Sequence, residues 1–432
     1  MKILVLGASG ILGRSICEVL KKNQILFMGS YYSNIIHGNN YFKFDIDKLD
    51  EIIEDFKPTI IINCIVNRQV DDCENKWNEI RSINIDLIDK LLTYQLKLIH
   101  ISTDYVFDGR NAPYSPQSLT NPINNYGISK LIAELRILNK TSNYLIIRVP
   151  VLFTDDYKNL NETAVTMIGK KLMDLTLNQF TEDAISIRRP VYIPLLSKFI
   201  YDCILNNYFG IYHFYNPNDK LTKYEIIKKI ADIINKPYDK IKPSYVIDNR
   251  PFDTNLLDDK YYINDYYKDS DFDEQLKLCF NKFYHRSNFN DCFLMINLDR
   301  TLINSNEIKM MDGAEYFINF LNRANINYVV IADINQIKVD YYKEKLPILK
   351  IIKNWIVKDD YENEKPDPKS FYLAKSKYYK YETFIIGIEN TIAGYEALKN
   401  ITPLIYINVQ DISTKILFKN KDVFLFNNFN QL

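Results

Sequence analysis

Residues 2–13 read KILVLGASGILG, an apolar run followed at once by three closely spaced glycines. A run this short and this apolar is typical of a strand buried on both faces of a parallel sheet. The glycines have GxxGxxG spacing, which permits a tight turn and lets a pyrophosphate approach the N-terminus of the following helix. The stretch therefore predicts a dinucleotide site at the first strand-to-helix junction, formed by Gly7, Ser9, Gly10, Ile11, Leu12 and Gly13.

The alternation of apolar strand and helical segment continues from this stretch to about Val149. The further strand-like runs are ILFMG (25–29), YFKFDI (41–46), TIIINCIV (59–66), LKLIHIS (96–102) and YLIIRVPVLF (144–153). This pattern predicts a Rossmann-type, doubly wound parallel sheet of the α/β class over residues 1–150. The pattern is looser over residues 151–286, which we interpret as a small substrate-binding part of the same domain, 1–286.

A second strand-and-helix alternation follows the polar stretch HRSNFND (285–291). Its strand-like runs are CFLMINL (292–298), NYVVIAD (327–333), WIVKD (355–359), TFIIGIE (383–389) and TPLIYINV (402–409). We therefore expect a second α/β domain over residues 292–432.

Composition narrows the class of partner. Lys plus Arg and Asp plus Glu both number 54, so the formal net charge is zero, and no block of like charge suggests binding to nucleic acid or membrane. Six cysteines occur without a CxxC pair, which argues against a zinc site and a disulfide scaffold. The first strand begins at Lys2 and no apolar run is long enough to span a bilayer, so we expect a cytoplasmic protein with a small-molecule or protein partner.

The residues after the second and third strands bear on the choice of cofactor. An acid after the second strand favours NAD, but the chain reads MGSYYS (28–33), with Ser30 and Tyr31 at that point. This favours NADPH over NADH without excluding NADH, since no arginine is present either. Asp45 and Ile46 follow the third strand and are candidates to lie against adenine, although Asp45 in a solvated loop is the alternative.

Polar residues also mark the end of the central strand, in ISTDYVFDG (101–109). Ser102 and Thr103 stand at its carboxyl end, where ligands bind in open α/β sheets. Tyr126 and Lys130 lie one turn apart at the start of a helix, and a nearby ammonium favours the phenolate form of tyrosine. We expect Thr103 to hydrogen-bond a substrate oxygen, Tyr126 to protonate it as hydride arrives, and Lys130, beside Tyr126, to reach the nicotinamide ribose.

Context is needed for this assignment because the spacing is not rare in the chain. Other Tyr and Lys pairs share it, among them Tyr224 with Lys228, Tyr238 with Lys242, and Tyr341 with Lys345. Only Tyr126 and Lys130 follow a hydroxyl-bearing strand end within the dinucleotide-binding pattern.

In these segments the sequence resembles the extended short-chain dehydrogenase/reductases, and among them the dTDP-4-dehydrorhamnose reductase branch. The resemblance covers roughly residues 1–285 and is carried by GASGILG (7–13), INCIVNRQVDDCE (62–74), SINIDL (82–87), ISTDYVFDG (101–109), YGISK (126–130), RRPVYI (188–193) and NRPFDTNLLDDK (249–260). The chain departs from the family at Cys64, Ile65 and Val66, where small alanines are usual, and in a shortened region around residues 155–163.

The resemblance implies roles for further residues. Asn63, Cys64 and Ile65 are expected to border the cofactor, with Ser102, and Asn84 to lie near the active site. The expected substrate contacts are Thr103, Asp104, Val106, Phe107, Arg189 and Arg250, with Arg188, Arg189 and Arg250 as candidates for a diphosphate; surface or packing arginines are the alternative.

The implied reaction is NADPH- or NADH-dependent reduction of the C4 keto group of a nucleotide-activated 6-deoxy-hexulose, of the dTDP- or UDP-4-dehydrorhamnose type, in rhamnose biosynthesis. A UDP-N-acetyl-4-keto-hexosamine substrate is an alternative. So is a non-catalytic, NADP-binding regulator, because the same branch includes the beta subunit of methionine adenosyltransferase. A homodimer, or a complex with a dehydratase or epimerase of the same pathway, also stays open.

The second domain resembles haloacid-dehalogenase-like phosphatases, whose first motif is DxDxT. INLDRTLI (296–303) has Asn297 at the nucleophile position and keeps Asp299, while Ala332 replaces a hydroxyl residue. Lys365 is present, and Glu389 and Asn390 stand where the family has two acids. Because an amide is a poor nucleophile and two negative charges are lost, we expect an inactive domain without Mg²⁺, serving in dimerisation, scaffolding or recruitment.

Overall fold

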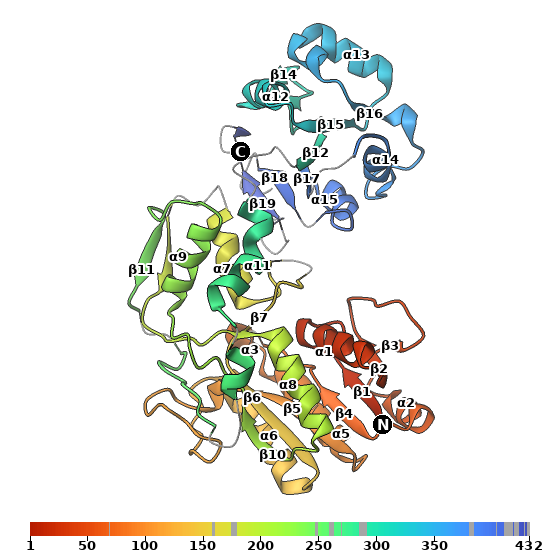
Figure 1. Ribbon diagram of the computed structural model, residues 1–432. Helices are drawn as coiled ribbons and strands as arrows, with labels where there is room; N and C mark the ends of the chain where they lie inside the picture. Colours follow the sequence, from red (N-terminus) through yellow and green to blue (C-terminus); the bar gives the residue numbers. More distant parts are fainter. Residues whose placement is uncertain are drawn as a thin grey trace.

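The computed structural model describes residues 1–68, 70–157, 160–173, 179–246, 249–258, 263–268, 270–284, 292–379, 384–402, 404–409, 418, 423–426 and 428–429. Two parallel sheets organise these residues, one in each half of the chain (Figure 1). The expected boundary between residues 286 and 292 falls in a stretch outside the described residues, so the division into two domains stays a prediction.

The first sheet confirms the expected doubly wound fold. All its strand pairs are parallel, and the order reverses at the central strand β1, which lies between β2 and β4. Ligands of open α/β sheets bind at the carboxyl ends of the strands beside such a reversal. Across the sheet the strands are β10 (Gly210–His213), β6 (Tyr144–Val149), β5 (Lys97–Thr103), β4 (Ile60–Asn63), β1 (Lys2–Leu6), β2 (Leu26–Tyr31) and β3 (Tyr41–Lys43).

Helices cover both faces of this sheet, which explains the unbroken apolar runs. Ile3 and Val5 of β1 pack in one apolar cluster with residues of α1 and α8, whereas Leu4 and Leu6 pack on the opposite face with α5 and α6. The helices are α1 (Ile11–Lys22), α2 (Leu49–Phe56), α3 (Val70–Asn75), α4 (Trp77–Arg81), α5 (Leu87–Leu92), α6 (Asn125–Lys140) and α8 (Ile193–Leu205), with the shorter turns η1 (Ser82–Asp86) and η2 (Asp104–Val106).

The expected internal division at residue 150 does not follow the sheet. α8 packs on α1, where Ser197 donates a hydrogen bond to Ser15 at 2.8 Å, and β10 pairs in parallel with β6 as an edge strand. The chain therefore leaves the first sheet after β6 and returns to it. The remaining described elements of this part are β7 (Leu152–Phe153), α7 (Ala164–Met173), β8 (Phe180–Asp183), β9 (Val191–Tyr192), α9 (Lys223–Ile233), β11 (Ile241–Ser244), α10 (Ile263–Tyr267) and α11 (Phe272–Tyr284).

The second sheet is also parallel, as expected for an α/β unit. Its order is β16 (Trp355–Val357), β15 (Asn327–Ala332), β12 (Cys292–Asn297), β17 (Phe384–Glu389), β18 (Ile405–Asn408) and β19 (Phe424–Phe426). It is accompanied by α12 (Ala314–Arg323), α13 (Gln336–Lys345), η5 (Pro347–Ile351), η6 (Lys358–Asp360), α14 (Lys369–Tyr378), α15 (Ile392–Leu398) and the hairpin of β13 (Ile303–Asn304) and β14 (Lys309–Met310). Its buried apolar residues are continuous with those of α7, α9 and α11, beside which it lies in Figure 1.

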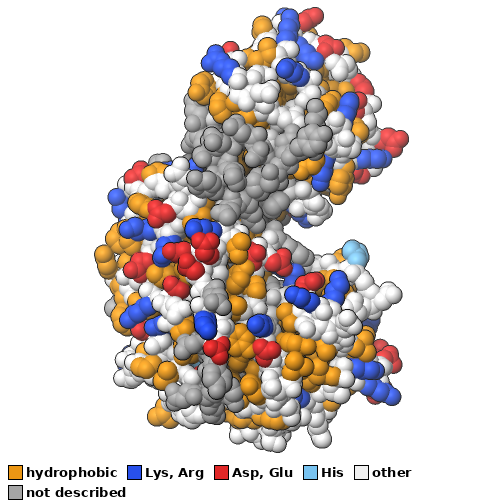
Figure 2. Space-filling view, in the orientation of Figure 1, with side chains coloured by type: hydrophobic (Ala, Val, Ile, Leu, Met, Phe, Trp, Pro, Cys, Tyr) orange, Lys and Arg blue, Asp and Glu red, His pale blue; other side chains and the backbone are white. Residues whose placement is uncertain are grey.

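The surface agrees with the balanced charge of the sequence. On the face drawn in Figure 2, basic and acidic side chains are interspersed, and neither sign forms a continuous patch. Of the helices that the structure describes, none has both the length and the apolar character needed to cross a bilayer.

Candidate active site

The glycine loop after β1 has the geometry of an anion cradle. Gly7 has a φ of +80°, a conformation that glycine adopts without strain. A Cβ added to Gly13 would lie 2.2 Å from the carbonyl oxygen of Gly7, so only glycine lets α1 pack this closely on the loop. α1 begins after Gly10 with no side chain hydrogen-bonded to its first N–H groups. These donors, with the positive end of the helix dipole, suit a pyrophosphate.

Ser30 lies beneath this loop. It is fully buried, and its Oγ accepts a hydrogen bond from the N–H of Gly7 at 2.9 Å. The sequence assigned Ser30 to the cofactor; in the structure its hydroxyl oxygen accepts a hydrogen bond from the loop backbone. Asp45 and Ile46 are exposed after β3, and Oδ1 of Asp45 accepts the N–H of Asp47 at 3.1 Å. Both stay available at the rim of the site.

The end of β4 forms the other side of the loop. Asn63 is buried, and its Oδ1 accepts the N–H of Ile65 at 3.1 Å, which shapes the turn that follows the strand. A Cβ added to Gly7 would come within 3.2 Å of the Ile65 side chain and 3.1 Å of the Cys64 backbone. Cys64 and Ile65 therefore border the glycine loop, and Asn63 holds their backbone in place.

The structure brings Thr103 and Tyr126 together at the carboxyl end of β5. α6 begins with Asn124, whose Oδ1 accepts the N–H of Gly127 at 2.8 Å. A Cβ added to Gly127 would lie 2.2 Å from the carbonyl oxygen of Tyr105, so the start of α6 is pressed against the turn after β5. This contact places Tyr126 near Thr103, whose side chain acts to lower the pKa of the phenol.

Burial dominates the electrostatics of this pair. It raises the pKa of Tyr126, while the side chain of Thr103 opposes the rise and the carboxyl of Asp104 adds to it. Tyr126 is therefore protonated at neutral pH, as a proton donor must be. Thr103 Oγ1 also accepts the N–H of Tyr105 at 3.2 Å and donates to Asp104 Oδ1 at 3.1 Å.

Lys130 is almost fully buried, and its partner is a histidine that sequence reasoning treated as an ordinary core residue. Lys130 Nζ lies 2.9 Å from His100 Nε2. Burial lowers the pKa of Lys130 to about 8, although Glu134 and Cys64 act to raise it. The signal available in the sequence was the position of His100 on β5, two residues before Ser102 and thus on the same face of the strand.

Ser102 faces away from Thr103, into a buried ionic network. Its hydroxyl donates to Glu134, which also forms a 2.7 Å ion pair with Arg148. His213 lies 3.4 Å from Arg148 through its Nε2. The sequence placed Ser102 in the cofactor site, but in the structure its hydrogen bond to Glu134 joins β5 to α6.

Asp104 is the acid nearest to Tyr126 in this site. It is buried and accepts a hydrogen bond from the Thr254 hydroxyl. Burial raises the pKa of Asp104 to about 6, although bonds from Thr254 and Thr103 and the charge of Arg188 oppose the shift. Ionisation of this buried carboxyl group at neutral pH therefore lowers the stability of the folded protein.

This gives a testable pH dependence for Asp104→Asn. Between the ordinary pKa of 3.8 and about 6, the folded chain keeps a proton that the unfolded chain releases, so the free energy of unfolding falls as pH rises through this window. The asparagine variant lacks this loss. We expect it to be more stable than wild type above pH 6, by about 1–3 kcal/mol, and the difference to vanish below about pH 4. Urea unfolding across this range measures it.

Asp45→Asn is the matched control, because this carboxylate is exposed. Its stability difference from wild type should stay flat across the same range. An Asp104→Asn variant that is less stable than wild type at neutral pH would contradict the burial argument.

Val106 and Phe107 are not placed to contact a ligand. Both are fully buried and pack with Tyr114 and Leu256, and the rings of Phe107 and Tyr114 stack with centroids 4.3 Å apart. The expectation that they contact substrate is therefore wrong. Their apolar side chains hold the turn after β5 against residues 249–258 instead.

Asn84 supports the site indirectly, through hydrogen bonds to neighbouring residues. It is buried, its Nδ2 donates to Ser129 Oγ at 3.0 Å, and its Oδ1 accepts the N–H of Asn67 at 2.9 Å. Ser129 in turn donates to the carbonyl of Tyr126 at 2.7 Å. Asn84 thus supports the turn of α6 that carries Tyr126 and Lys130.

Cationic side chains gather between β8, α9 and residues 249–258. Burial lowers the pKa of Lys223, and the charges of Arg250 and Arg188 lower it further. Arg188 is buried, and its Nη2 has no hydrogen-bond partner among the described residues, with Asp183 at 3.7 Å. Lys223, the first residue of α9, carried no signal in the sequence. Arg189 donates to the Pro217 carbonyl at 3.4 Å, and its buried Nε has no hydrogen-bond partner among the described residues.

The strand ends of the second sheet hold a compact polar cluster around Lys365. Lys365 Nζ donates to Asn297 Oδ1 at 3.0 Å and forms ion pairs with Glu389 and, at 3.1 Å, with Asp333. Burial lowers the pKa of Lys365, but the two carboxylates outweigh burial and raise it above its ordinary value. The second oxygen of Glu389 accepts three hydrogen bonds from Asn390 and Thr391.

Asn297 and Asn390, the two amides in place of acids, are bonded to each other. Asn297 Nδ2 donates to Asn390 Oδ1 and to the Asp299 carbonyl, both at 3.0 Å. Asp299 itself is exposed, and Ala332 is buried at the end of β15. Within the described residues, no group of three or more His, Cys, Asp or Glu side chains is placed to hold a metal ion. Lys365 thus pairs with both carboxylates, and the two amides bond to each other.

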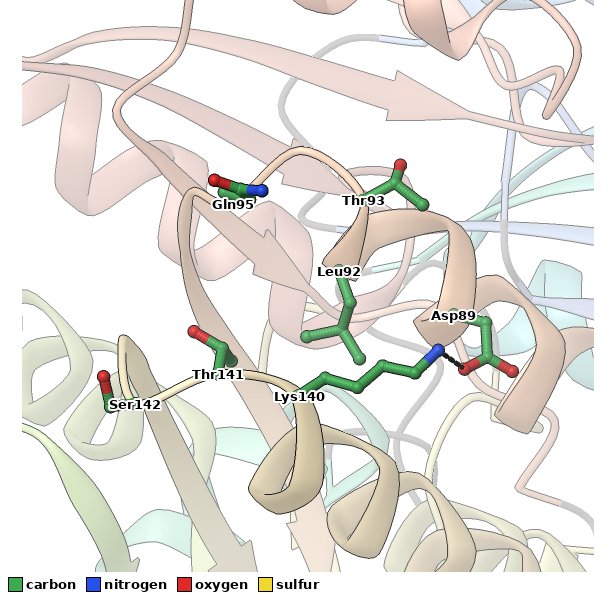
Figure 3. A pocket seen from close by; sticks show the side chains of 7 residues that line it. All are labelled: Asp89, Leu92, Thr93, Gln95, Lys140, Thr141 and Ser142. Carbon is green, nitrogen blue, oxygen red and sulfur yellow. Dashed lines mark hydrogen bonds and ion pairs between the residues drawn. The ribbon is translucent and has the colours of Figure 1, made fainter.

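A hollow of about 540 Å³ lies away from the strand-end residues described above. Figure 3 shows its lining, with the ion pair of Lys140 and Asp89 at 2.9 Å. It lies beyond the C-terminal ends of α5 and α6, at the amino ends of β5 and β6, whereas Thr103 ends β5 at the opposite edge. The lining residues are Asp89, Leu92, Thr93, Gln95, Lys140, Thr141 and Ser142. None of the residues that line this hollow is a buried polar side chain.

Comparisons with known proteins support the family resemblance of the first domain. A sequence model described as the RmlD substrate binding domain matches residues 1–284. The methionine adenosyltransferase 2 subunit beta of Xenopus tropicalis is 31% identical over 260 residues, which are 56% of this chain and 75% of that protein. The dTDP-4-dehydrorhamnose reductase of Aggregatibacter actinomycetemcomitans is 28% identical over 227 residues, 49% of this chain and 72% of that protein.

Solved structures agree on the fold. A hypothetical dTDP-4-dehydrorhamnose reductase from Sulfolobus tokodaii is 26% identical, with a TM-score of 0.51 over 59% of this chain and 92% of that one. A dTDP-4-dehydrorhamnose reductase from Bacillus anthracis, in complex with NADP, is 23% identical, with a TM-score of 0.52 over 65% and 99%. At this identity the second likeness bears on the fold alone. The family match ends at residue 284, before β12 begins.

Proposed function

The chain belongs, over residues 1–284, to the RmlD substrate binding domain family, and from that premise we propose that it is an NAD(P)H-dependent reductase of a nucleotide-activated 6-deoxy-hexulose. The reaction is reduction of the C4 keto group of a dTDP- or UDP-4-dehydrorhamnose type of sugar, in rhamnose biosynthesis. One observation carries the proposal most directly, the proximity of Tyr126 to Thr103, which acts on the pKa of the phenol, with Lys130 one turn along α6.

The residues of the first loop fit a nicotinamide dinucleotide. The uncapped start of α1 would hold the pyrophosphate, with Gly7, Gly10 and Gly13 allowing its close approach. Cys64 and Ile65 would border its nicotinamide half, and Asp45 and Ile46 its adenine. When bound, the reduced cofactor supplies a hydride. Without an acid after β2, we favour NADPH over NADH.

Side chains of the protein supply the proton for the reduction. Thr103 holds the keto oxygen of the sugar by a hydrogen bond, within reach of Tyr126. Tyr126 donates its phenolic proton to this oxygen as charge develops on it, and the ammonium of Lys130 favours the phenolate that remains. In the free protein the Thr103 hydroxyl donates to Asp104, so its proton must turn from Asp104 to the keto oxygen when the sugar binds.

The cationic group of Arg188, Lys223 and Arg250 is the proposed site for the substrate diphosphate. Burial lowers the pKa of Lys223, and the nearby charges of Arg250 and Arg188 lower it further. A bound anion would offset the repulsion between these cations. Glu182 and Asp183 offset part of the charge in the free protein. Arg189 is assigned to the same site.

Nicotinamide absorbance followed over time tests the proposal. Purified protein, NADPH or NADH and the 4-keto-6-deoxy product of a dTDP- or UDP-glucose dehydratase should together give oxidation that depends on the keto sugar. Comparison of the two nucleotides and the two cofactors then names the substrate. Cofactor binding without oxidation by any keto sugar would refute the reductase.

A regulatory subunit is the second candidate, because relatives named methionine adenosyltransferase 2 subunit beta reach 32% identity with this chain. In this case the dinucleotide site would serve binding rather than turnover. Size-exclusion chromatography with a catalytic methionine adenosyltransferase subunit, with and without NADP, distinguishes the two. A stable complex without keto-sugar turnover would favour the regulator.

For the second domain we propose an inactive phosphatase-like unit. The mutual hydrogen bond of Asn297 and Asn390 occupies the position where the resembling family has two acids. We expect millimolar Mg²⁺ to leave the thermal unfolding midpoint of the protein unchanged, since only a ligand of the folded state raises it. The double variant Asn297→Asp with Asn390→Asp, which regains two carboxylates, should gain Mg²⁺-dependent stability. A wild-type midpoint that rises with Mg²⁺ would contradict this proposal.

A further inference from the structure

His100 occupies a central place beside the proposed catalytic residues. It lies on β5, one of the inner strands of the first sheet (Figure 1), and only 1% of its surface is exposed. In the pairing of β4 with β5 it is the register partner of Asn63, the residue before Cys64. The imidazole is therefore level with the strand end that borders the glycine loop.

The contact with Lys130 determines how the imidazole is protonated. Lys130 Nζ, 2.9 Å from His100 Nε2, carries only donors, so Nε2 must accept and the ring proton belongs on Nδ1. His100 Nδ1 is buried and has no hydrogen-bond partner among the described residues. A buried donor without a partner lowers the stability of the folded protein. Within the described part of the chain, His100 Nδ1 is thus left without a partner, while Nε2 accepts a hydrogen bond from Lys130.

The titratable groups around Lys130 come from three elements. Glu134 lies one turn along α6, Cys64 follows β4, and His100 belongs to β5. Burial and the Lys130 ammonium together hold the pKa of His100 well below its usual value, so the imidazole is neutral wherever the protein is folded. A neutral acceptor stabilises the ammonium without forming a carboxylate ion pair that would raise the pKa of Lys130 much further.

We propose that His100 is a positioning residue, which holds the Lys130 ammonium at the carboxyl end of β4, beside Cys64, and keeps it protonated for its action on Tyr126. The kinetic part of this inference rests on the proposed reductase function. The contact itself and its effect on Lys130 do not.

Two substitutions separate the hydrogen bond from the bulk of the side chain. His100→Gln keeps an acceptor oxygen, whereas His100→Leu fills similar space without one. Titration of lysine side chains by carbon-13 NMR, in protein without cofactor and with the Lys130 signal assigned from Lys130→Met, reports the Lys130 ammonium directly. We expect the leucine variant to lower the titration midpoint by about one pH unit and the glutamine variant to stay near wild type.

The pH profile of keto-sugar reduction gives the second readout. Loss of the Lys130 proton should end activity on the alkaline side near pH 8 in the wild type. This limb should move to lower pH in His100→Leu and return in His100→Gln. A purely structural role would change rate or stability without moving the limb. His37→Leu, at an exposed histidine, is the control and should leave the limb in place.

The two hypotheses fail in different ways. If the wild type shows no reduction, the proposed function is wrong, but the NMR titration still decides the role of His100. An unchanged Lys130 midpoint in His100→Leu overturns the inference. If His100→Leu does not fold, the double variant with Lys130→Met must fold, because it removes the unpaired ammonium; failure of both would also overturn it.

Discussion

Replacement of Tyr126 by phenylalanine is expected to slow keto-sugar reduction by about 10²–10⁴-fold, the usual contribution of a positioned proton donor. The keto oxygen would develop negative charge with Thr103 as its remaining hydrogen-bond donor. The aromatic ring itself stays in place, because it packs edge-to-face against Tyr105 with centroids 6.1 Å apart. NADPH affinity, measured by nicotinamide fluorescence, should therefore change far less than the turnover number.

Tyr341→Phe is the matched control for this substitution. Tyr341 has the same spacing to a lysine, Lys345, whose Nζ lies 5.9 Å from its ring centroid, but it belongs to α13 beside the second sheet. Its rate should equal that of the wild type. A Tyr126→Phe variant within tenfold of the wild type would remove Tyr126 from the proposed mechanism.

Replacement of Lys365 by methionine is expected to destabilise the second domain by about 3–5 kcal/mol, the cost of leaving a buried charge without its partner. Glu389 is fully buried, and one of its oxygens pairs with Lys365. The other oxygen keeps its bonds from Asn390 and Thr391, so the carboxylate is fastened in place and cannot turn to water. The loss should appear in urea unfolding of the variant.

Two further variants make this measurement specific. The chain has two tryptophans, Trp77 in the first domain and Trp355 on β16, so a Trp77→Phe background makes tryptophan fluorescence report the second domain alone. Adding Glu389→Gln to Lys365→Met removes the unpaired charge and should recover a large part of the stability. Equal stability of the single variant and the Trp77→Phe parent would show that the ion pair carries little free energy.

Much of the fold follows from short-range patterns. The strand, glycine turn and helix of residues 2–22 were expected from the sequence because aliphatic runs and glycine spacing act over one or two turns of chain. The second parallel sheet was expected for the same reason. The place of β10 in the first sheet was not expected, because the pairing of residues 210–213 with β6 depends on a chain that leaves the sheet and returns to it about 60 residues later.

The candidate site divides in the same way. The sequence alone determined that Thr103 ends a buried strand and that Tyr126 and Lys130 share one face at the start of a helix, since both statements concern residues close together in the chain. It did not determine that Ser102 turns toward Glu134 or that Phe107 stacks on Tyr114. Neighbouring residues of a strand point to opposite faces, and only the packed structure decides which face meets the ligand.

The role of His100 belongs wholly to the tertiary structure. Its distance of 2.9 Å to Lys130 joins a strand to a helix 30 residues later, and the pairing of β5 with β4 sets it beside Asn63. Lys223 and Arg250 likewise become neighbours only when α9 packs near residues 249–258. Such contacts depend on how elements pack at long range, which residue type and local spacing do not specify.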